Sequence, residues 1–406
     1  MHKKGSVLGG TLLLTGSVTG AGMLGLPIMS GLAGFFPSII CFFFAWAFMS
    51  LTGLLLVEVN GWFSNRVNLI TMVGRTLGKK GKAVCWTLYL FLFYSLLLAY
   101  IAGMGGLTTK ILGEYFNIAF PTWAASLIFV LVFGWIIYLG TRPVDLWNRV
   151  MMGGKIAAFL CLVFLGAQHI QPALLKRSEP QFLLYSIPIL VIAFGFHNLI
   201  PSLTNYFHND VKKVRFSIIF GGLLALILYL IWDLIVLGIV PLQGESGILA
   251  SLKNGNEAVQ SLVGVLGSSA VSTFASILAF FAFLTSFLAQ SLSLSHFLAD
   301  GLKVDYKTKK EGWLVILALF PPLLFAILYP NIFLKALNFA GGICAVILFG
   351  ILPVLMVWRG RYKQEIKSHY RLFGGKLLLS LLFLAAAFIA FFQLSSMFHA
   401  PYLPKF

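Results

Sequence analysis

The stretch Thr15–Pro27 reads TGSVTGAGMLGLP and lies inside a long apolar run near the N-terminus. It contains four glycines, and each glycine inside a helix costs about 1 kcal/mol relative to alanine. In a bilayer, unwound backbone is tolerated only where protein or a water-filled cavity receives its polar groups. The stretch therefore predicts a membrane helix that breaks near its middle. Close packing of small residues is the simpler alternative, but it explains the pair Gly16 and Gly20 better than the cluster from Gly20 to Gly22.

A second interruption lies within Ile187–Phe207, which reads IPILVIAFGFHNLIPSLTNYF. Gly195, His197, Asn198 and Pro201 fall near its middle, where a lipid-facing helix would carry leucine. Interrupted spans at matching positions of two halves are the sequence signature of a transporter binding site. Unwinding exposes amide groups that favour a carboxylate and carbonyl groups that favour a cation. Such a pair of helix ends suits a zwitterionic amino acid.

The composition indicates a membrane protein. Of its 406 residues, 59% are hydrophobic and only 10% are charged, and the mean hydropathy is +0.95. Soluble domains carry about 25% charged residues. Apolar runs of about 20 residues, enough to cross about 30 Å of hydrocarbon, recur along the chain. We predict an all-α polytopic membrane protein, one transmembrane domain over residues 1–406, with eleven spans near 6–33, 35–62, 84–112, 121–141, 147–168, 182–206, 214–241, 262–299, 312–330, 332–358 and 373–398.

The distribution of charge predicts the orientation. The net charge of +17 is not gathered in a continuous basic stripe, so we predict no nucleic-acid partner. Most Lys and Arg residues fall in alternate loops, on the side of the N-terminus, which places that terminus in the cytoplasm and the C-terminus in the periplasm. The first apolar run continues to Phe36, so we expect a retained span rather than a cleaved signal peptide.

Several function classes are disfavoured by what the sequence lacks. It has no phosphate-binding loop of the G-x-x-x-x-G-K-S/T type, which argues against an ATP-driven pump. Histidines and carboxylates are scattered, and the four cysteines occur singly in apolar surroundings. We therefore predict no enzymatic activity, no cofactor and no metal site.

Three motifs together resemble the hydroxy and aromatic amino acid permeases of bacteria, within the amino acid–polyamine–cation superfamily. They are TGSVTGAGMLGLP at 15–27, FGFHNLIPSL at 194–203 and FFAFLTSFLAQSLSLSHFLADGL at 280–302. Within these permeases the chain is most similar to the tyrosine- and tryptophan-specific transporters. The resemblance implies an inverted 5+5 repeat of the leucine-transporter type, with repeats near 6–168 and 182–358 and an extra helix near 373–398. It also implies import of tyrosine, or next tryptophan, by proton symport with alternating access across the bacterial inner membrane.

The resemblance also implies roles for individual residues. The backbone of the first break would face the amino and carboxyl groups of the substrate, at Ser17, Thr19, Gly20, Ala21, Gly22 and Met23. The second break would surround the side chain of the substrate through Phe194, Gly195, Phe196, His197, Asn198 and Ser202. Tyr100, in the third span, is a candidate aromatic lid. Thr285 and Ser286 match positions that help to hold sodium in sodium-coupled relatives.

Lys155 is the most informative charge, because it falls inside the predicted fifth span. A charge at the centre of a bilayer costs at least about 2.5–3.5 kcal/mol. One interpretation is a lysine that reaches back to the interface. Our preferred interpretation places Lys155 between the first, fifth and eighth spans, near Thr285 and Ser286, with its ammonium where sodium sits in relatives. Loss and gain of its proton would then bias the two access states.

His197 and Asp233 are the other ionisable groups of interest. For His197, three interpretations stay open: a proton carrier, a hydrogen-bond partner of the substrate, or a neutral structural residue. Asp233 is expected to pair with another polar group in the bundle. Two alternative functions also stay open, a sodium-coupled carrier of another small amino acid and a membrane sensor that transports nothing.

Overall fold

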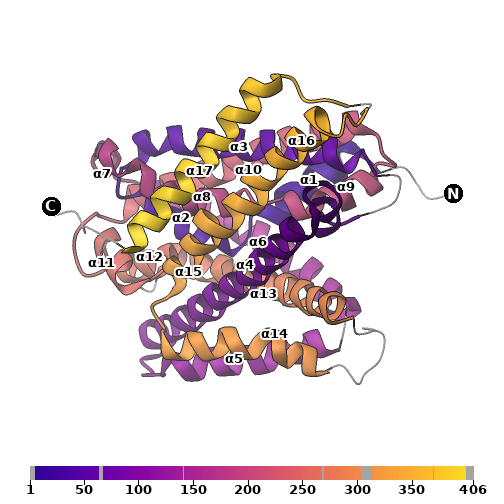
Figure 1. Ribbon diagram of the computed structural model, residues 1–406. Coiled ribbons are helices and arrows are strands. Elements are labelled where there is room, and N and C mark those ends of the chain that lie inside the picture. The colour runs from indigo at the N-terminus through magenta and orange to yellow at the C-terminus, as the bar shows by residue number, and fades with distance from the viewer. Residues whose placement is uncertain are drawn as a thin grey trace.

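The computed structural model describes residues 5–63, 67–139, 141–267, 269–303, 312–368 and 370–398. Within those ranges every regular element is a helix, and together they form one bundle (Figure 1). Eight helical stretches are long and apolar enough to cross a membrane among the residues described, namely Phe35–Asn60, Leu69–Phe116, Val150–His169, Pro180–Tyr206, Val211–Ile239, Ala270–Leu302, Phe333–Tyr362 and Gly375–Met397. The chain is therefore a polytopic membrane protein.

The predicted first span is a broken helix. It consists of α1 (Val7–Val18), the 3₁₀ turn η1 (Ala21–Gly25) and α2 (Leu26–Ser30). The two halves are bent by 49° relative to each other. Taken together, they are long and apolar enough to form one further membrane span. Two shorter apolar helices of 17 residues each, α5 (Thr122–Tyr138) and α14 (Gly312–Leu328), lie at the lower limit of length for a crossing. The count of eleven spans thus stays a prediction.

Most remaining elements follow the predicted runs with shifted ends, whereas the short helices α7 (Pro172–Leu175) and α11 (Ile248–Asn254) lie between predicted runs. The others are α3 (Phe35–Asn60), α4 (Leu69–Phe116), α6 (Thr141–Gly166), η2 (Ala167–His169), η3 (Pro180–Ser186), α8 (Ile187–Ala193), η4 (His197–Leu199), α9 (Ile200–Tyr206), α10 (Val211–Ile239), α12 (Ala258–Leu266), α13 (Ala270–Leu302), α15 (Phe333–Phe339), the π-helical η6 (Ala340–Ile351), α16 (Leu352–Tyr362) and α17 (Gly375–Phe398).

The prediction of one long span over 262–299 was wrong at its start. Gly267 ends α12 with a positive φ of 60°, a conformation that glycine adopts without steric cost. The next helix, α13, begins at Ala270, capped by the Ser269 hydroxyl, which accepts from the amide of Ser272. The beginning of the predicted span therefore belongs to the short helix α12, and the crossing starts after the turn. A similar kink at Gly78 (φ 85°) separates the first turns of α4 from its long membrane part.

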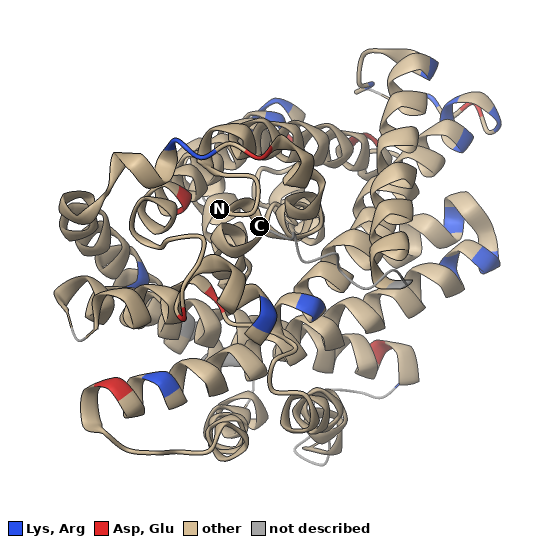
Figure 2. Ribbon diagram, turned by 90° about the vertical axis from the view of Figure 1, so that its left-hand side faces the viewer, with Lys and Arg blue, Asp and Glu red and all other residues tan. Residues whose placement is uncertain are grey.

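Long-range packing brings the functional elements together. Helix α13 packs against α6 and α4, while α10 packs against α1 and α3. Helices α5 and α14 lie side by side along the lower edge in Figure 1, and α17 packs along η6 on the outside of the bundle. Seen from the end that carries α11, most of the ribbon is uncharged, and the few charged residues are scattered over it (Figure 2).

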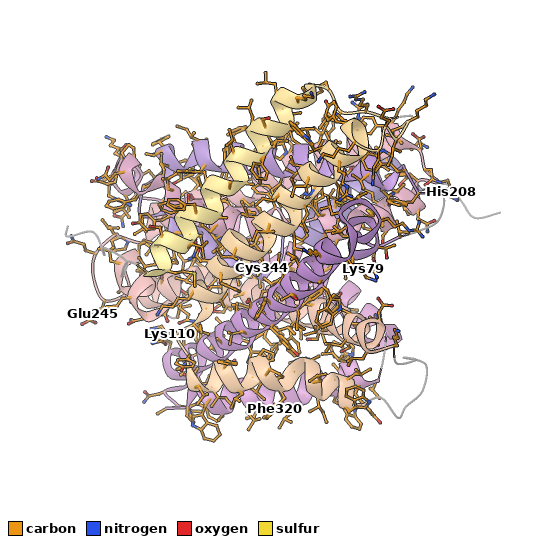
Figure 3. All side chains as sticks on the ribbon, in the orientation of Figure 1. Lys79, Lys110, His208, Glu245, Phe320 and Cys344 are labelled. Carbon is orange, nitrogen blue, oxygen red and sulfur yellow. The ribbon has the colours of Figure 1, made fainter. Side chains whose placement is uncertain are left out.

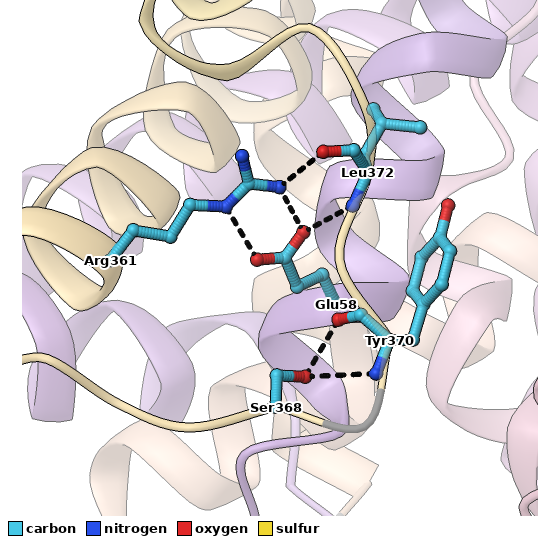
Figure 4. A network of polar contacts seen from close by, with 5 residues as sticks. All are labelled: Glu58, Arg361, Ser368, Tyr370 and Leu372. Carbon is cyan, nitrogen blue, oxygen red and sulfur yellow. Dashed lines mark hydrogen bonds and ion pairs between the residues drawn. The ribbon is translucent and has the colours of Figure 1, made fainter.

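A buried ion pair ties the end of α3 to the end of α16, and the segment before α17 joins it (Figure 4). Arg361 binds both carboxylate oxygens of Glu58, with Nε 2.7 Å from Oε1, and Glu58 is only 1% exposed. The backbone of Leu372 closes the network: its amide donates to Glu58 (2.9 Å) and its carbonyl accepts from Arg361 (3.0 Å). Ser368 and Tyr370 close the adjoining turn, with the Ser368 hydroxyl 2.7 Å from the carbonyl of Tyr370. Because both charges are paired and hydrogen-bonded, removing either one would leave a buried charge.

Candidate functional site

A cavity of about 1040 Å³ lies between the two broken helices and α4, α6, α13 and η6. It extends from the breaks toward the end of the molecule where α1 begins, since Leu12, Asn68 and Asp300 also line it. Ligand pockets typically measure about 300–1,000 Å³. The cavity therefore has room for an amino acid together with water.

Lys155 and Ser286 hold the first break from two sides. Regular helix ends at Val18, and the ammonium of Lys155, from α6, donates to the carbonyl of Thr19 over 2.6 Å. From α13, the hydroxyl of Ser286 accepts a hydrogen bond from the amide of Ala21 at 2.9 Å. Lys155 is 5% exposed, and its ammonium binds the break instead of reaching the interface. The unwound backbone is thus satisfied by protein groups, as the membrane interior requires.

Two aromatic residues of α10, which the sequence did not single out, also bind the first broken helix. The indole of Trp232 donates to the carbonyl of Met23 at 3.0 Å. The hydroxyl of Tyr229 lies 2.7 Å from the carbonyl of Val18 and 2.8 Å from that of Ala193. Val18 is the last residue of α1 and Ala193 the last of α8, so one hydroxyl joins the ends of both half-helices. The only sequence signal for this contact is the spacing of Tyr229 and Trp232, which lie about one helical turn apart on the same face of α10.

Asp233, one position further along α10, is completely buried and contacts α2, the second half of the same broken helix. Its Oδ1 accepts a hydrogen bond from the hydroxyl of Ser30 over 2.5 Å. Its other oxygen has no hydrogen-bond partner among the residues described. Three residues of one α10 face therefore contact this helix at three levels.

The second break is shorter and is closed by its own turns. Helix α8 ends at Ala193, and the amide of Gly195 donates back to the carbonyl of Ile192 at 3.0 Å. The amide of Leu199 then bonds the carbonyl of Phe196 at 2.8 Å, which starts η4. The whole stretch Pro180–Tyr206 is nevertheless long and apolar enough to cross a membrane as one span. Both interruptions predicted from the sequence are therefore present.

His197 is held inside the second break. Its ring stacks on Phe349 with centroids 4.8 Å apart and on Phe196 at 5.0 Å, and its Nε2 lies 3.0 Å from the hydroxyl of Thr52. That hydroxyl also lies 3.0 Å from the carbonyl of Phe48 in its own helix. When Thr52 donates to Phe48, the His197 Nε2 must be the donor to Thr52, and Nδ1, which has no partner among the described residues, is left as an acceptor.

Most predicted site residues line the cavity. Those lining it from the substrate set are Ser17, Gly20, Gly22, Tyr100, Gly195, Phe196, His197, Asn198 and Ser202, and those from the coupling set are Lys155, Thr285 and Ser286. The exposed Asn198 accepts a hydrogen bond from the hydroxyl of Tyr89, a further lining residue that the sequence did not predict. The Thr285 hydroxyl donates to the carbonyl of Phe281 at 2.8 Å, within its own helix.

Four predicted substrate residues do not line the cavity. Thr19, Ala21, Met23 and Phe194 are buried behind its wall. Their side chains point into the bundle; for Thr19, Ala21 and Met23 it is backbone groups that bind other helices. Whether these four residues bind the substrate stays a prediction, and for Thr19, Ala21 and Met23 that prediction concerns the backbone of the break.

Comparisons with known proteins show the family of the chain. The profile of the tryptophan/tyrosine permease family matches residues 3–393. The chain belongs to this family. The permease is 31% identical over 400 residues to the "Tyrosine-specific transport system 1" of Haemophilus influenzae, covering 98% of each chain. It is 31% identical over 383 residues to a "Tryptophan-specific transport protein" of Shigella flexneri, covering 93% of this chain and 92% of the relative. A third relative, the "Low affinity tryptophan permease" of Escherichia coli, is 25% identical over the full length of this permease.

Proposed function

We propose that this permease is a secondary active transporter that imports aromatic amino acids, tyrosine first and tryptophan next, across the bacterial inner membrane. The observation that carries the proposal is that two broken helices line one interior cavity in a chain of the tryptophan/tyrosine permease family. Transport proteins named for tyrosine and for tryptophan occur among its relatives at the same identity. Family membership alone therefore does not choose between these two substrates.

The binding mode follows from the two breaks. The substrate carboxylate would lie at the start of η1, where Gly20 and Gly22 expose backbone to the cavity. The aromatic ring would lie against Phe196 and beneath Tyr100, which lines the cavity and is 5% exposed. The exposed amide of Asn198 would bond the phenol or indole of the substrate. Phenylalanine, which lacks such a group, should compete less well.

We propose eleven crossings arranged as two inverted repeats, about 6–168 and 182–358, followed by an extra helix. The packing supports this assignment. The broken helices take the first place in each half, α5 and α14 take the fourth place, and these last two have equal length and pack against each other. At about 1.5 Å per residue, 17 residues span about 25 Å. That length suits a thinned bilayer or helix ends that project little.

For coupling, we propose a proton carried by Lys155. Its ammonium lies 2.6 Å from the carbonyl of Thr19, on the same break that Ser286 holds. A sodium ion placed there would compete with this ammonium for the same oxygen and would be repelled by it. Deprotonation of Lys155 would release Thr19 and favour rearrangement of the first broken helix. Alternation between the two states would then follow the proton as well as the substrate.

The test is transport by the purified full-length protein in proteoliposomes. Counterflow of labelled tyrosine, challenged with each standard amino acid, should be inhibited by tyrosine and tryptophan and weakly by small aliphatic amino acids. An acidic exterior should drive accumulation, and replacing sodium by choline should leave it unchanged. Sodium dependence would support the alternative carrier, and absence of counterflow for every aromatic amino acid would reject transport in favour of a sensor.

A further inference from the structure

A second, smaller cavity lies at the far end of α4. This cavity, here called the end pocket, measures about 410 Å³, and its walls include Gly103, Gly106, Lys110, Glu114, Gln260 and Phe333. Lys110 lies at the opposite end of the bundle from Lys79 and His208 (Figure 3). The main cavity extends toward the end where α1 begins, so the two cavities face opposite sides. With the N-terminus in the cytoplasm, the end pocket is on the periplasmic side.

The end pocket carries groups that complement an amino acid. The Lys110 ammonium and the Glu114 carboxylate lie 2.7 Å apart, and their side chains are 31% and 37% exposed. Gln260 adds an amide, and it lies close over α4 because Gly106 has no side chain: a Cβ there would be 2.7 Å from its Nε2. Phe333 closes the inner end of the pocket, where its side chain is buried. A cation and an anion within one small pocket match the two charged groups of a zwitterionic amino acid.

A thin layer of side chains separates the end pocket from the main cavity. Tyr100 lines the main cavity, and Gly103, one turn further along α4, lines the end pocket. Phe283 and Phe333 meet edge to face over Gly103, with ring centroids 5.7 Å apart. A Cβ on Gly103 would lie 2.4 Å from the Phe283 ring, so glycine is what lets the two rings close there. Both rings are at most 1% exposed.

We propose that the end pocket is a first docking site for the transported amino acid on the periplasmic side. Lys110 binds the substrate carboxylate, and Glu114 binds its ammonium group. Separation of Phe283 and Phe333 then opens the way to the main cavity. This inference rests on the proposed transport of aromatic amino acids, and it adds a site outside the two helix breaks.

The end pocket is also connected to the first break. Gln260 belongs to α12, and this helix packs against η1 and α2 of the first broken helix. A substrate that binds Gln260 therefore contacts an element that touches the part of α1–α2 expected to move. Helix α12 therefore contacts both the end pocket and the first broken helix.

The test measures transport separately from each side. Full-length protein is reconstituted, its orientation is determined by protease access to a terminal tag, and initial rates of labelled tyrosine entry are measured. Lys110→Gln and Glu114→Gln should raise the KM for entry from the end-pocket side about three- to tenfold. The KM from the opposite side should change by less than about twofold. Lys253→Gln, which removes an exposed cation from neighbouring α11 outside the end pocket, is the matched control.

A charge swap distinguishes docking from helix stabilisation. An i,i+4 ion pair by itself stabilises a helix only slightly. The double variant Lys110→Glu with Glu114→Lys keeps that pair but reverses its polarity, so the docking site predicts a raised KM and a structural role predicts normal entry. Normal entry in the swap, or equal shifts from both sides in the single variants, would overturn the docking site. If wild-type protein shows no counterflow of any aromatic amino acid, the proposed function itself fails, which is a separate result.

Discussion

The two helix breaks solve the same problem in different ways. In the first, backbone groups are bound by side chains that arrive from elsewhere: Lys155 from α6, Tyr229 and Trp232 from α10, and Ser286 from α13. In the second, two local turns close the backbone, and the aromatic stack of His197 with its neighbours fills the space. The first broken helix bends by 49°, whereas the stretch that contains the second break, Pro180–Tyr206, forms a single membrane span.

This difference follows from the glycine content of the two breaks. It determines whether a break offers backbone groups or side chains for binding. The first break contains Gly20, Gly22 and Gly25, which leave the backbone accessible to large partners. The second contains Gly195 alone, between two phenylalanines. One break therefore offers backbone groups and depends on tertiary partners, while the other offers side chains and depends mostly on its own sequence. Tyr229 is the residue that binds both.

The largest expected effect comes from removing a partner of the first break. Lys155→Met leaves the buried carbonyl of Thr19 without its donor, a loss of about 1–3 kcal/mol, and removes the proposed proton site. Proton-driven accumulation of tyrosine in proteoliposomes should fall at least about tenfold, while counterflow persists. Lys335→Met, at an exposed position of α15, is the control and should transport normally. Full accumulation by Lys155→Met would show that the first break does not need this partner.

Adding a methyl group to each break tests whether their backbones are held differently. A Cβ at Gly195 would lie 2.8 Å from the carbonyl of Ile192, which is rigid backbone. A Cβ at Gly20 would lie 2.7 Å from the Ser286 hydroxyl, which can rotate away. We expect Gly195→Ala to lower the free energy of unfolding by about 1–3 kcal/mol and Gly20→Ala to cost less but weaken substrate binding. Thermal unfolding and binding titrations measure both, with Gly153→Ala, where nothing lies within 4 Å, as the neutral control. A larger stability loss for Gly20→Ala would reverse the comparison.

Tyr229→Phe should disturb both breaks together. It removes the hydroxyl shared by Val18 and Ala193 and should cost about 1–3 kcal/mol, with a higher KM for tyrosine. Tyr94→Phe is a matched control, because the hydroxyl of Tyr94 bonds the carbonyl of Leu317 at 2.9 Å, between α4 and α14. That variant should lose some stability without a change in KM. Identical KM values for the two variants would mean that Tyr229 has no special role between the breaks.

The smallest expected effect is a pH dependence of local stability, and it is confined to the first break. Glu257 caps α12 by accepting from the amides of Val259 (2.6 Å) and Gln260 (3.0 Å), and burial raises the pKa of its carboxyl group to about 8 despite these bonds. Because the folded state holds this proton more tightly, the stabilisation is complete below a pH of about 4.5 and is lost as pH rises through about 8.

Hydrogen exchange measures this pH effect. Protection of α12, and of η1 and α2 against which it packs, should fall between about pH 4.5 and pH 8 after correction for intrinsic exchange. Glu257→Gln should remove the dependence, and η4 of the second break serves as the internal reference. Equal pH dependence at η4 would contradict a contact confined to the first break.

The sequence predicted the breaks more accurately than their surroundings. Glycine clusters and the long apolar runs were sufficient to locate both interruptions, and most of the site residues that the family resemblance implied line the cavity. They did not reveal Tyr229 or Trp232, because an aromatic residue in an apolar helix looks the same whether it faces lipid or binds a carbonyl. They also did not reveal the ion pair of Glu58, since its partner Arg361 is 303 positions away.

What the sequence by itself determined is where regular helix fails and which segments belong in lipid, because both depend on the local chemistry of glycine, proline and apolar side chains. Which side chains bind the freed backbone, and where the two cavities lie, was decided only by tertiary structure. Those bonds join residues as far apart as Ala21 and Ser286, 265 positions in the chain. Their partners are set by helix packing, which no local pattern records.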